Sequence, residues 1–454
     1  MTDTVINPQD YVLNYATVFT SSSNYIELKH LIIEFNYYED IFTNNITGNI
    51  VVNDSGDLLT LFSFSGNEYF VFSVDKPGLN SPIEKVARIY SVTKRTLTKD
   101  TNENYILNFC SEEMLLSEQY RVSKSYKNKK VSQVVEDICT SYLKINPKKL
   151  GTGSIEETSN VLDLIVPNLK PFEAINWLCT YAQSATSQTK SSTYLFFENR
   201  DGFNFKSLQS LYDGAVYASY YYEPKNLVSP IDNRIKDLDA DMRNALTYTI
   251  INQFNSLSSI AEGAFANKLL TVDLINQSYD KSIFDYASYF TQSKKLNSSG
   301  LLTNSQNRFG KAMNETPEGA LRLVSSIKKQ SKNEYVLGKG QQIKDIDIEN
   351  FIPYRMAQLS HISTIRLKLT VPGDVLLKVG QVIIFNLPHV NEDRQTGKTL
   401  DELYSGKYLI TAVRHKTDQT GVFQTTLEIC KESLPNPYMQ FNNSSSLLSK
   451  LRSE

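Results

Sequence analysis

The hydrophobic positions in the first quarter of the chain alternate with polar ones, as they do in half-buried strands. Over residues 26–115, alternating segments such as EKVARIYSVTKRTLT and ENYILNFCSEE are separated by clusters rich in Gly, Pro, Asp and Ser. Those residue types supply the backbone angles that tight chain reversals need. Five or more short strands without a long intervening helix predict a closed or nearly closed antiparallel barrel, which we assign to residues 1–115.

From about residue 116 the hydrophobic period becomes that of an amphipathic helix. Apolar residues over 131–143 recur at the spacing that places them on one helix face. A second helix is expected to begin at Pro171, because the first turn of a helix tolerates the missing N–H of proline. The segment STYLFFENRDGFNFKSL predicts a hairpin that turns within residues 199–202. We therefore predict a mixed α/β insertion over residues 116–235.

Strand patterns resume at residues 236–289 and again at 350–436, and we assign both segments to a second barrel. Between them, residues 290–349 are predicted to form a polar, basic insertion, since residues 290–344 hold 10 basic and 3 acidic side chains, a net charge of +7. A solvated loop or helix face is the plainer interpretation of such a charge run, and a site for an acidic partner is the alternative. The remaining residues, 437–454, are predicted to be a C-terminal tail.

The two barrel regions also resemble each other in sequence. RIYSVTKRTLTKDTNENYILNFCSEEML matches YLITAVRHKTDQTGVFQTTLEICKESL, with Val92 opposite Val413 and Cys110 opposite Cys430. In the same way, KHLIIEFNYYEDIF resembles NKLLTVDLINQSYDKSIFDY. Such an internal repeat predicts two copies of one structural unit, with chance similarity between hairpins as the alternative. Three copies of the chain would then place six barrels in a ring.

The composition is that of an ordinary globular protein. Hydrophobic residues make up 41% and charged residues 21%, and 47 Lys and Arg against 49 Asp and Glu give a net charge of −2. This balance argues against duplex binding driven by overall charge. Residues 1–115 are more acidic, with 7 basic and 15 acidic side chains, a net of −8. Because the apolar runs are short and the chain begins without a signal-peptide pattern, we expect no stable membrane binding.

The sequence shows no pattern typical of a catalytic, cofactor or metal site. Histidines and cysteines are scattered, at His30, His361, His389 and His415 and at Cys110, Cys139, Cys179 and Cys430. The cysteines are expected to be small buried groups. Asp237, Asp239 and Asp241 resemble the start of a calcium loop, but the required Gly and Glu are missing further on. LGTGS at 150–154 and GKGQ at 338–341 lack the frame of a phosphate-binding loop.

Two features leave other chemistry open. Glu112 and Glu113 form a carboxylate pair that could act on a glycan as general acid and base, although a structural role at the end of a strand is the plainer interpretation. The tyrosines of residues 217–222 could stack on sugars or bases. A strand that buries them against a neighbouring subunit is the plainer interpretation.

Four segments together resemble the baseplate central hub protein of contractile-tailed bacteriophages: NITGNIVVNDSGDLLTLFSFSGNEYFVFSV, KPFEAINWLCTYAQS, RLKLTVPGDVLLKVGQVIIFNLP and SGKYLITAVRHK. They stand in the order expected for the family and cover most of 25–115, the 171–183 helix and 350–435, whereas residues 281–345 match nothing. The positions that carry the pattern, all taken as structural, are Gly48, Asp54, Gly66, Glu68, Trp177, Gly373, Gly380 and Gly406.

The resemblance implies a mainly β protein with α/β insertions, built from two similar antiparallel tube-type β-barrels. It also implies a non-enzymatic, cofactor-free homotrimer in the tail baseplate of the virion, assembled in the cytoplasm of the bacterial host. Such a hub joins the central spike protein to the tail tube or tube-initiator protein and leaves a lumen for viral DNA during ejection. Wedge and tape-measure proteins are further candidate partners. An acidic first barrel would suit the lumen, because a negative wall repels phosphates, and a merely soluble acidic surface is the alternative.

Two other functions remain open at the level of sequence. The same barrels would serve the hub of a phage-derived injection or secretion machine, or of a non-contractile tail. From a different class, a β-rich cell-wall glycan hydrolase or binding protein would use Glu112 and Glu113.

Overall fold

The computed structural model describes residues 7–436, apart from 21–23, 63, 100–101, 147–149, 151–153, 187–190, 223–237, 274–276, 301–310, 326–347 and 394–397. The predicted tail at 437–454 lies outside the described residues, and so does much of the polar stretch at 290–349. The glycine-rich segment at 338–341 and most of the one at 150–154 also lie outside them.

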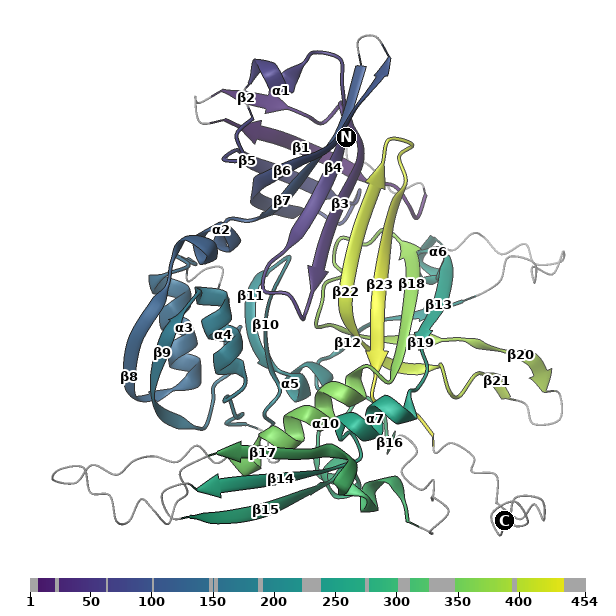
Figure 1. Ribbon diagram of the computed structural model, residues 1–454. Helices are drawn as coiled ribbons and strands as arrows, with labels where there is room; N and C mark the ends of the chain where they lie inside the picture. Colours follow the sequence, from purple (N-terminus) through teal and green to yellow (C-terminus); the bar gives the residue numbers. More distant parts are fainter. Residues whose placement is uncertain are drawn as a thin grey trace.

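Strands from both predicted barrels join in one 13-stranded sheet (Figure 1). Its strands are β1 (Val12–Phe19), β2 (Tyr25–Glu27), β3 (Ile32–Asp40), β4 (Thr47–Asp54), β5 (Tyr69–Asp75), β6 (Ile83–Lys99), β7 (Asn102–Ser111), β12 (Val216–Tyr221), β13 (Thr247–Asn252), β18 (Ile365–Pro372), β19 (Val382–Asn386), β22 (Gly406–Asp418) and β23 (Phe423–Lys431). The hydrogen-bonded order is β13-β18-β23-β22-β3-β4-β7-β6-β5-β1-β2; in addition, β19 pairs with β22, and β12 pairs with β19. The prediction of a mainly β chain with antiparallel sheets is confirmed.

The first half of this sheet folds over a core of aromatic rings. Alternate residues of β3, β4 and β7 point inward, and β1 and β5 cover them from the other side of the core. Phe35, Phe70, Phe72 and Phe109 meet there, with ring centroids 5.0 to 6.0 Å apart. Rings at such distances add specific edge and stacking contacts to their apolar burial. This half therefore has its own core.

The second half closes on itself more completely. Its order is β13-β18-β23-β22-β19-β12, and the end of β12 returns to the start of β13 through a bridge between Tyr221 and Asn244. The Ala245 N–H donates to the Tyr221 carbonyl at 2.8 Å. One pair departs from the antiparallel pattern, since β12 runs parallel to β19. The prediction that placed β12 in the 116–235 insertion is wrong, because hydrogen bonding to β19 places it in the second barrel.

The internal repeat is visible in the strand pairing. β6 and β7 form a hairpin with Val92 opposite Leu107, and β22 and β23 form the matching hairpin with Val413 opposite Leu427. On the far side of each hairpin, β4 and β3 in the first half correspond to β18 and β13 in the second.

The second sequence match, between residues 29–42 and 267–286, is wrong. Residues 267–286 form β14 (Ala266–Asp273) and β15 (Ser278–Asp285), which belong to a separate three-stranded sheet with β17 (Leu321–Ser325). Consequently the prediction that 236–289 is wholly the start of the second barrel fails for β14 and β15. Alternation alone predicts a strand and does not say which sheet the strand joins.

Two insertions flank the second barrel and pack against each other. The first holds α2 (Glu112–Gln119), β8 (Val122–Lys130), α3 (Val131–Ser141), β9 (Val161–Leu169), α4 (Pro171–Cys179), β10 (Tyr194–Asn199), β11 (Gly202–Ser207) and α5 (Leu208–Tyr212). The second holds α7 (Ser256–Glu262), β14, β15, α8 (Tyr286–Gln292), β16 (Ser299–Gly300), η2 (Met313–Glu315), η3 (Pro317–Ala320), β17, η4 (Ile348–Asn350) and α10 (Ile352–Ile362). The other elements are α1 (Leu58–Leu61), α6 (Leu238–Arg243), β20 (Pro388–Asp393), β21 (Lys398–Leu400) and β24 (Ser433–Leu434). The predicted helices over 131–143 and from Pro171, and the hairpin turn at 199–202, are confirmed.

Contacts between the insertions go both to backbone carbonyls and to side chains. The Arg355 guanidinium on α10 donates to the carbonyls of Cys179, Ser192 and Tyr194 at 3.2 to 3.4 Å. The Gln209 amide donates to the Tyr289 hydroxyl at 2.6 Å. Segments far apart in the sequence thus form one lobe beside the large sheet (Figure 1).

Candidate functional site

The two barrels are joined by direct pairing between β22 and β3. This antiparallel ladder runs from Ala412 opposite Asp40 to Asp418 opposite Glu34. Its inward side chains are buried, with Val413 2% exposed and Tyr37 fully covered. The junction is therefore a continuation of the sheet and not a flexible linker (Figure 1).

The repeat places a second pair of strands in the equivalent position, and this pair is open. β6 corresponds to β22 and β13 corresponds to β3, yet in the described residues neither finds the partner that its counterpart has. Val92, equivalent to Val413, is 38% exposed, and Ile250, equivalent to Tyr37, is 40% exposed. Beyond residue 91, β6 is paired on one side only, with β7. Each chain thus has one closed junction, between β22 and β3. It also has the two equivalent strands, β6 and β13, which in the described part of the chain are not paired with each other.

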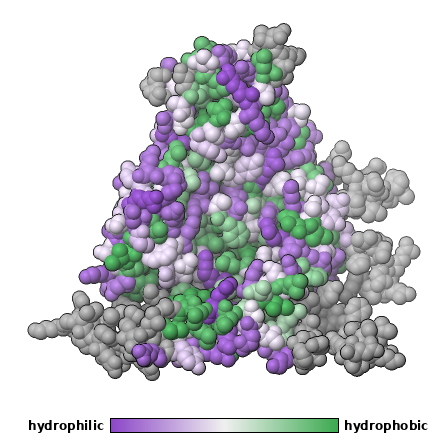
Figure 2. Space-filling model, in the orientation of Figure 1, coloured by the Kyte–Doolittle hydropathy of each residue, from purple (hydrophilic) through white to green (hydrophobic). Residues whose placement is uncertain are grey.

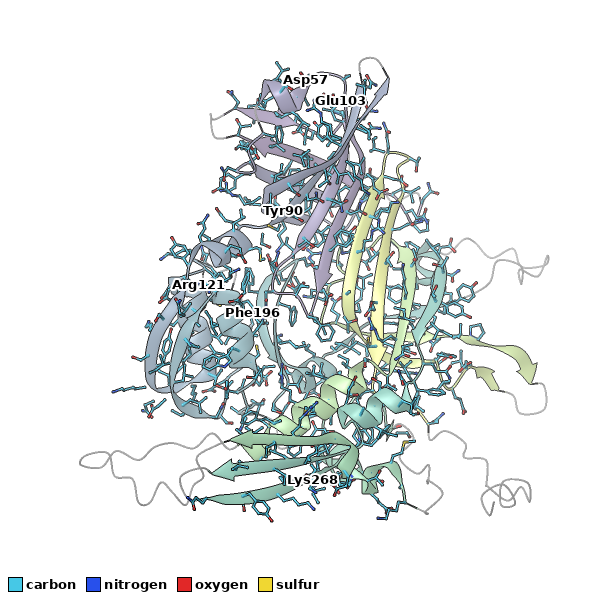
Figure 3. The ribbon with its side chains drawn as sticks, in the orientation of Figure 1. Asp57, Tyr90, Glu103, Arg121, Phe196 and Lys268 are labelled. Atoms are coloured by element: carbon cyan, nitrogen blue, oxygen red, sulfur yellow. The ribbon has the colours of Figure 1, made fainter. Side chains whose placement is uncertain are left out.

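Large apolar side chains extend along both open strands. On β6, Tyr90 and Leu97 are exposed, and the end of the β6–β7 hairpin projects past the barrel near Asp57 and Glu103 (Figure 3). On and after β13, the exposed apolar side chains are Ile250, Ile251, Phe254 and Leu257. An apolar strand edge of this kind invites pairing with another chain.

Another apolar surface lies on the small sheet of the second insertion. Tyr279, Ile283, Leu321 and Leu323 are exposed on the face of β15, β14 and β17 that points away from α10. In the space-filling view, apolar side chains gather over β17 and β14 (Figure 2). Soluble monomers rarely show several such patches, so these surfaces are typical of a protein that assembles.

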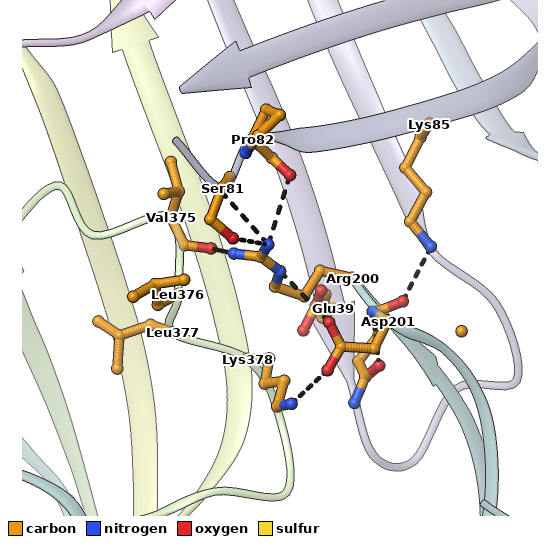
Figure 4. Close-up of polar contacts among 12 residues, drawn as sticks. Glu39, Ser81, Pro82, Lys85, Arg200, Asp201, Val375, Leu376, Leu377 and Lys378 are labelled. Atoms are coloured by element: carbon orange, nitrogen blue, oxygen red, sulfur yellow. Dashed lines mark hydrogen bonds and ion pairs between the residues drawn. The ribbon is translucent and has the colours of Figure 1, made fainter. Parts of the chain in front are cut away.

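The tip of the β10–β11 hairpin holds the two barrels and the insertion together (Figure 4). The Arg200 guanidinium donates to the Val375 carbonyl in the second barrel and to the Ser81 hydroxyl, at 3.0 Å, and the Ser81 and Pro82 carbonyls in the first. Its neighbour Asp201 accepts from Lys378. One largely covered cation therefore donates to carbonyls of both barrels, and these carbonyls would lose their donor if Arg200 were removed.

A second contact of the same hairpin runs to the first barrel. Glu198 forms an ion pair of 3.1 Å with Lys85 on β6 and accepts from the Ile46 N–H at 3.1 Å. Both side chains of the pair are largely buried, at 13% and 4% exposed. Because their geometry includes these further hydrogen bonds, the charges are compensated inside the protein.

Glu39 is a buried carboxylate at the centre of the junction. It accepts from the Val379 N–H at 3.0 Å and from the Tyr37 hydroxyl at 2.9 Å. Burial raises the pKa of Glu39 to about 7, and those hydrogen bonds and Lys85 oppose the rise. The sequence carried a signal for this site, because Glu39 has the same strand parity as the core residues Phe35 and Tyr37.

The four family-pattern positions of the first barrel have local structural roles. A Cβ on Gly48 would lie 2.1 Å from the Phe109 ring. The Asp54 carboxylate accepts from the N–H groups of Gly56 and Leu58 at 2.7 and 2.8 Å. Glu68 accepts from the Gly66 N–H at 2.9 Å, and Gly66 has a φ of 84° that favours glycine. These contacts fix two turns and one close approach between strands.

The remaining pattern positions lie apart from these. Trp177 packs edge-on against Tyr181 in the insertion. In the second barrel, a Cβ on Gly373 would meet the Phe423 ring at 2.0 Å, Gly380 has a φ of 84°, and Gly406 lies against Pro435. Thus the eight positions do not converge on a single site. Their importance for the function of the protein stays a prediction.

Catalytic candidates from the sequence are not brought together. Among the described residues there is no cluster of three or more His, Cys, Asp or Glu side chains that could hold a metal ion. Burial lowers the pKa of His361 and of His415 to about 4, and the four cysteines are free and buried, as predicted. Glu112 opens α2 and accepts from the Tyr69 hydroxyl at 2.8 Å. No helix within the described ranges is long and apolar enough to cross a membrane.

The tyrosines of β12 are engaged within their own chain. Tyr220 is buried in the second barrel, and the Tyr217 hydroxyl donates to Asp374 at 2.7 Å. The Arg243 guanidinium lies 5.7 Å from both ring centroids. The plainer interpretation, that a neighbouring subunit buries this strand, is wrong for Tyr220, because β19 and the barrel core already cover it.

No family model matches the chain, but individual known proteins are similar to it. A probable baseplate hub protein of Vibrio phage KVP40 is 19% identical over 360 residues, which cover 79% of each chain. A tail protein from Neisseria meningitidis MC58 shares the fold, with a TM-score of 0.50 and 11% identity over 93% of this chain and 97% of that one. The sequence similarity and the shared β-rich fold agree with the pattern residues, and the chain is similar to a baseplate hub protein and to a tail protein.

Proposed function

We propose that three copies of this chain form a ring-shaped baseplate hub, in which β6 of one copy pairs with β13 of the next. The observation that carries the proposal is the closed β22–β3 junction, because the repeat supplies the same two strands again in open form. Pairing them between copies would repeat the intramolecular junction and remove both exposed edges.

The contact joins different surfaces of two copies, so it is of the head-to-tail kind that closes into a ring when the rotation permits. Three is the copy number that the family resemblance implies. Six similar barrels would then surround one axis and present near-sixfold symmetry to a tube and threefold symmetry to a spike. The hub thus matches the symmetries of its two neighbours without any catalytic step.

In the assembled tail, the ring would hold the central spike protein on one side and the tail tube or its initiator on the other. Viral DNA would pass through the lumen during ejection. The tail baseplate of the virion is the corresponding location, and assembly in the host cytoplasm precedes it. The eight family-pattern positions keep a structural role in this proposal.

Light scattering of the purified full chain tests the ring. The wild type should form a particle of three times the chain mass, and Val92→Asp or Ile250→Asp should each reduce it to a monomer, since either variant places an unpaired charge in the new interface. Ile165→Asp, at an exposed position on β9, is the matched control and should leave the trimer intact. Combining Val92→Lys with Ile250→Asp should restore the trimer in part, because the two positions would be diagonal neighbours across the paired strands.

A wild type that stays monomeric at high concentration would overturn the proposal. So would trimers that form equally well with Val92→Asp and Ile250→Asp, since assembly would then use other surfaces.

A further inference from the structure

The six strands at the centre of the large sheet present one continuous face that is mostly polar, with Val51 and Ile106 as apolar members. Every second residue of β18, β23, β22, β3, β4 and β7 points to this side, as their cross-strand partners show. The opposite side chains are those of the two barrel cores. We call this surface the polar face.

Charges on the polar face are equal in number and largely paired. Its cations are Arg366, Lys368, Arg414 and Lys416, and its carboxylates are Glu34, Asp40, Asp418 and Glu428. Glu34 lies 2.9 Å from the Lys416 ammonium and 3.4 Å from the Arg414 guanidinium. Arg366 is ion-paired with Glu428, which stands opposite Lys368 across the strands. The four positive and four negative side chains sum to zero.

Neutral side chains between these charges bond to one another. The Asn36 amide donates to Asn49 at 2.9 Å, and Asn108 donates to the hydroxyls of Ser91 and Thr93 at 3.0 and 3.1 Å. Arg414 is also held by Asn36, at 2.7 and 2.9 Å. Polar groups that already have partners offer few strong sites to a passing ligand.

The charge state of Glu34 supports this balance at neutral pH. Burial acts to raise its pKa, but hydrogen bonds from Asn36 and Lys416 outweigh burial and hold the pKa of Glu34 below its ordinary value. The carboxylate that faces two cations is therefore ionised.

The other side of the sheet is already occupied. β1 and β5 cover the core face of the first barrel, and β12, β19 and residues of α5 cover that of the second. A ring closed through β6 and β13 would therefore have the barrel walls and insertions outside. The polar face is the surface left for the inside of the ring.

We infer that the polar face lines the hub channel as a charge-balanced wall, which lets a nucleic acid pass without holding it. This inference rests on the proposed function for its position in the ring. The acidic wall suggested by the net charge of residues 1–115 is not present, because only Glu34 and Asp40 of those 15 acidic residues lie on the polar face. On the polar face, ion pairs between side chains keep phosphates from binding, because each cation is screened by a neighbouring carboxylate. Repulsion by an acidic wall is then not needed.

Fluorescence anisotropy with a short labelled oligonucleotide, single-stranded or duplex, tests the inference. Wild type should show no binding at low ionic strength. The double variant Glu34→Gln/Glu428→Gln leaves four cations against two carboxylates, and its affinity for the oligonucleotide should rise by about tenfold or more and fall steeply with added salt.

The matched control removes two carboxylates elsewhere. Glu118→Gln/Glu318→Gln changes the net charge equally and also breaks two ion pairs, those with Lys170 and Lys268. Both lie away from the polar face, so this variant should bind no better than wild type. If the first pair fails to fold, Thr47→Lys/Thr370→Lys adds two cations to the polar face without removing a partner and should give the same gain.

Three results would overturn the inference: salt-sensitive binding by wild type, equal binding by face and control variants, or no gain in either face variant. Light scattering on the same samples reports the ring separately, because the polar face is open in a single chain as well. Within a confirmed trimer, nuclease should digest the strand bound to Glu34→Gln/Glu428→Gln more slowly than free strand. Digestion at the same rate would place the polar face outside the channel.

Discussion

The closed junction between β22 and β3 and the open strands β6 and β13 are two versions of one arrangement. In the closed version, Val413 and Tyr37 are buried, whereas their equivalents Val92 and Ile250 are 38% and 40% exposed. The strands, their order and their hydrophobic parity are the same in both. The difference is whether the partner strand belongs to the same chain. Val92 and Ile250 are thus exposed at positions where the equivalent residues, Val413 and Tyr37, are buried by the β22–β3 contact.

The two versions also differ in polar chemistry. At the closed junction, Glu39 and Arg200 bond to groups from both barrels, and such buried polar contacts fix one geometry. At the open edges, apolar side chains such as Val92, Leu97 and Ile250 are exposed beside polar ones. The closed junction is therefore held by buried polar contacts. The open strands, which would pair between copies, instead expose apolar side chains.

The largest contrast should come from the same substitution in the two versions. Val413→Asp buries an unpaired carboxylate in the barrel core and should lower the free energy of unfolding by about 4 kcal/mol or more. Val92→Asp should change it by about 0.5 kcal/mol at most, because the side chain is exposed in the single chain. Urea unfolding of the two variants at low protein concentration measures both. Equal losses would mean that β6 and β22 are not equivalent.

Removal of the Arg200 side chain tests how much its hydrogen bonds to both barrels stabilise the closed junction. Arg200→Ala leaves carbonyls of both barrels without a donor, and we expect a loss of about 3 kcal/mol in the free energy of unfolding. Arg121→Ala removes an exposed arginine that bonds to the Asn168 carbonyl and should cost about 0.5 kcal/mol or less. If the two alanine variants unfold at the same urea concentration, Arg200 does not hold the barrels together.

The pH dependence of stability should depend on Glu39. The folded pKa of about 7 exceeds the ordinary value of 4.5, so the stabilising effect of the bound proton is complete below pH 4.5 and is lost as the pH rises through 7. Glu39→Gln cannot titrate and should gain about 2 kcal/mol relative to wild type between pH 5 and pH 8. Parallel stability curves for the two proteins over this range would contradict the account.

The smallest effect on folding is expected at the open edge on and just after β13. Ile251→Ser and Phe254→Ser replace side chains that are 45% and 61% exposed, so each should change the free energy of unfolding by about 0.5 kcal/mol or less. The same variants should weaken the trimer, which dilution in mass photometry would detect. A loss of folding stability without any change in assembly would show that these residues serve the monomer.

Much of the fold was predictable because its signals are local. The 131–143 period, Pro171 and the turn at 199–202 each depend on neighbours in sequence, and each is confirmed. The assignment of β14 and β15 failed because sheet membership is set by tertiary pairing, and the parallel contact of β12 with β19 depends on residues that are far apart.

The candidate site was less visible. The Val92 and Val413 hairpins revealed the repeat, but sequence could not show which strand edges the chain itself closes. Arg200 resembled any charged residue in a polar turn, since its partners are carbonyls from distant loops. Glu39 carried a signal that no prediction used, because a carboxylate on the core side of a strand indicates a buried polar contact.

A map of the purified particle by electron cryomicroscopy would show which strands join the copies. We expect a threefold particle in which β6 of each copy lies antiparallel beside β13 of the next, so that one sheet surrounds a channel. A particle in which Val92 and Ile250 both face solvent, with the copies joined through other surfaces, would contradict this expectation.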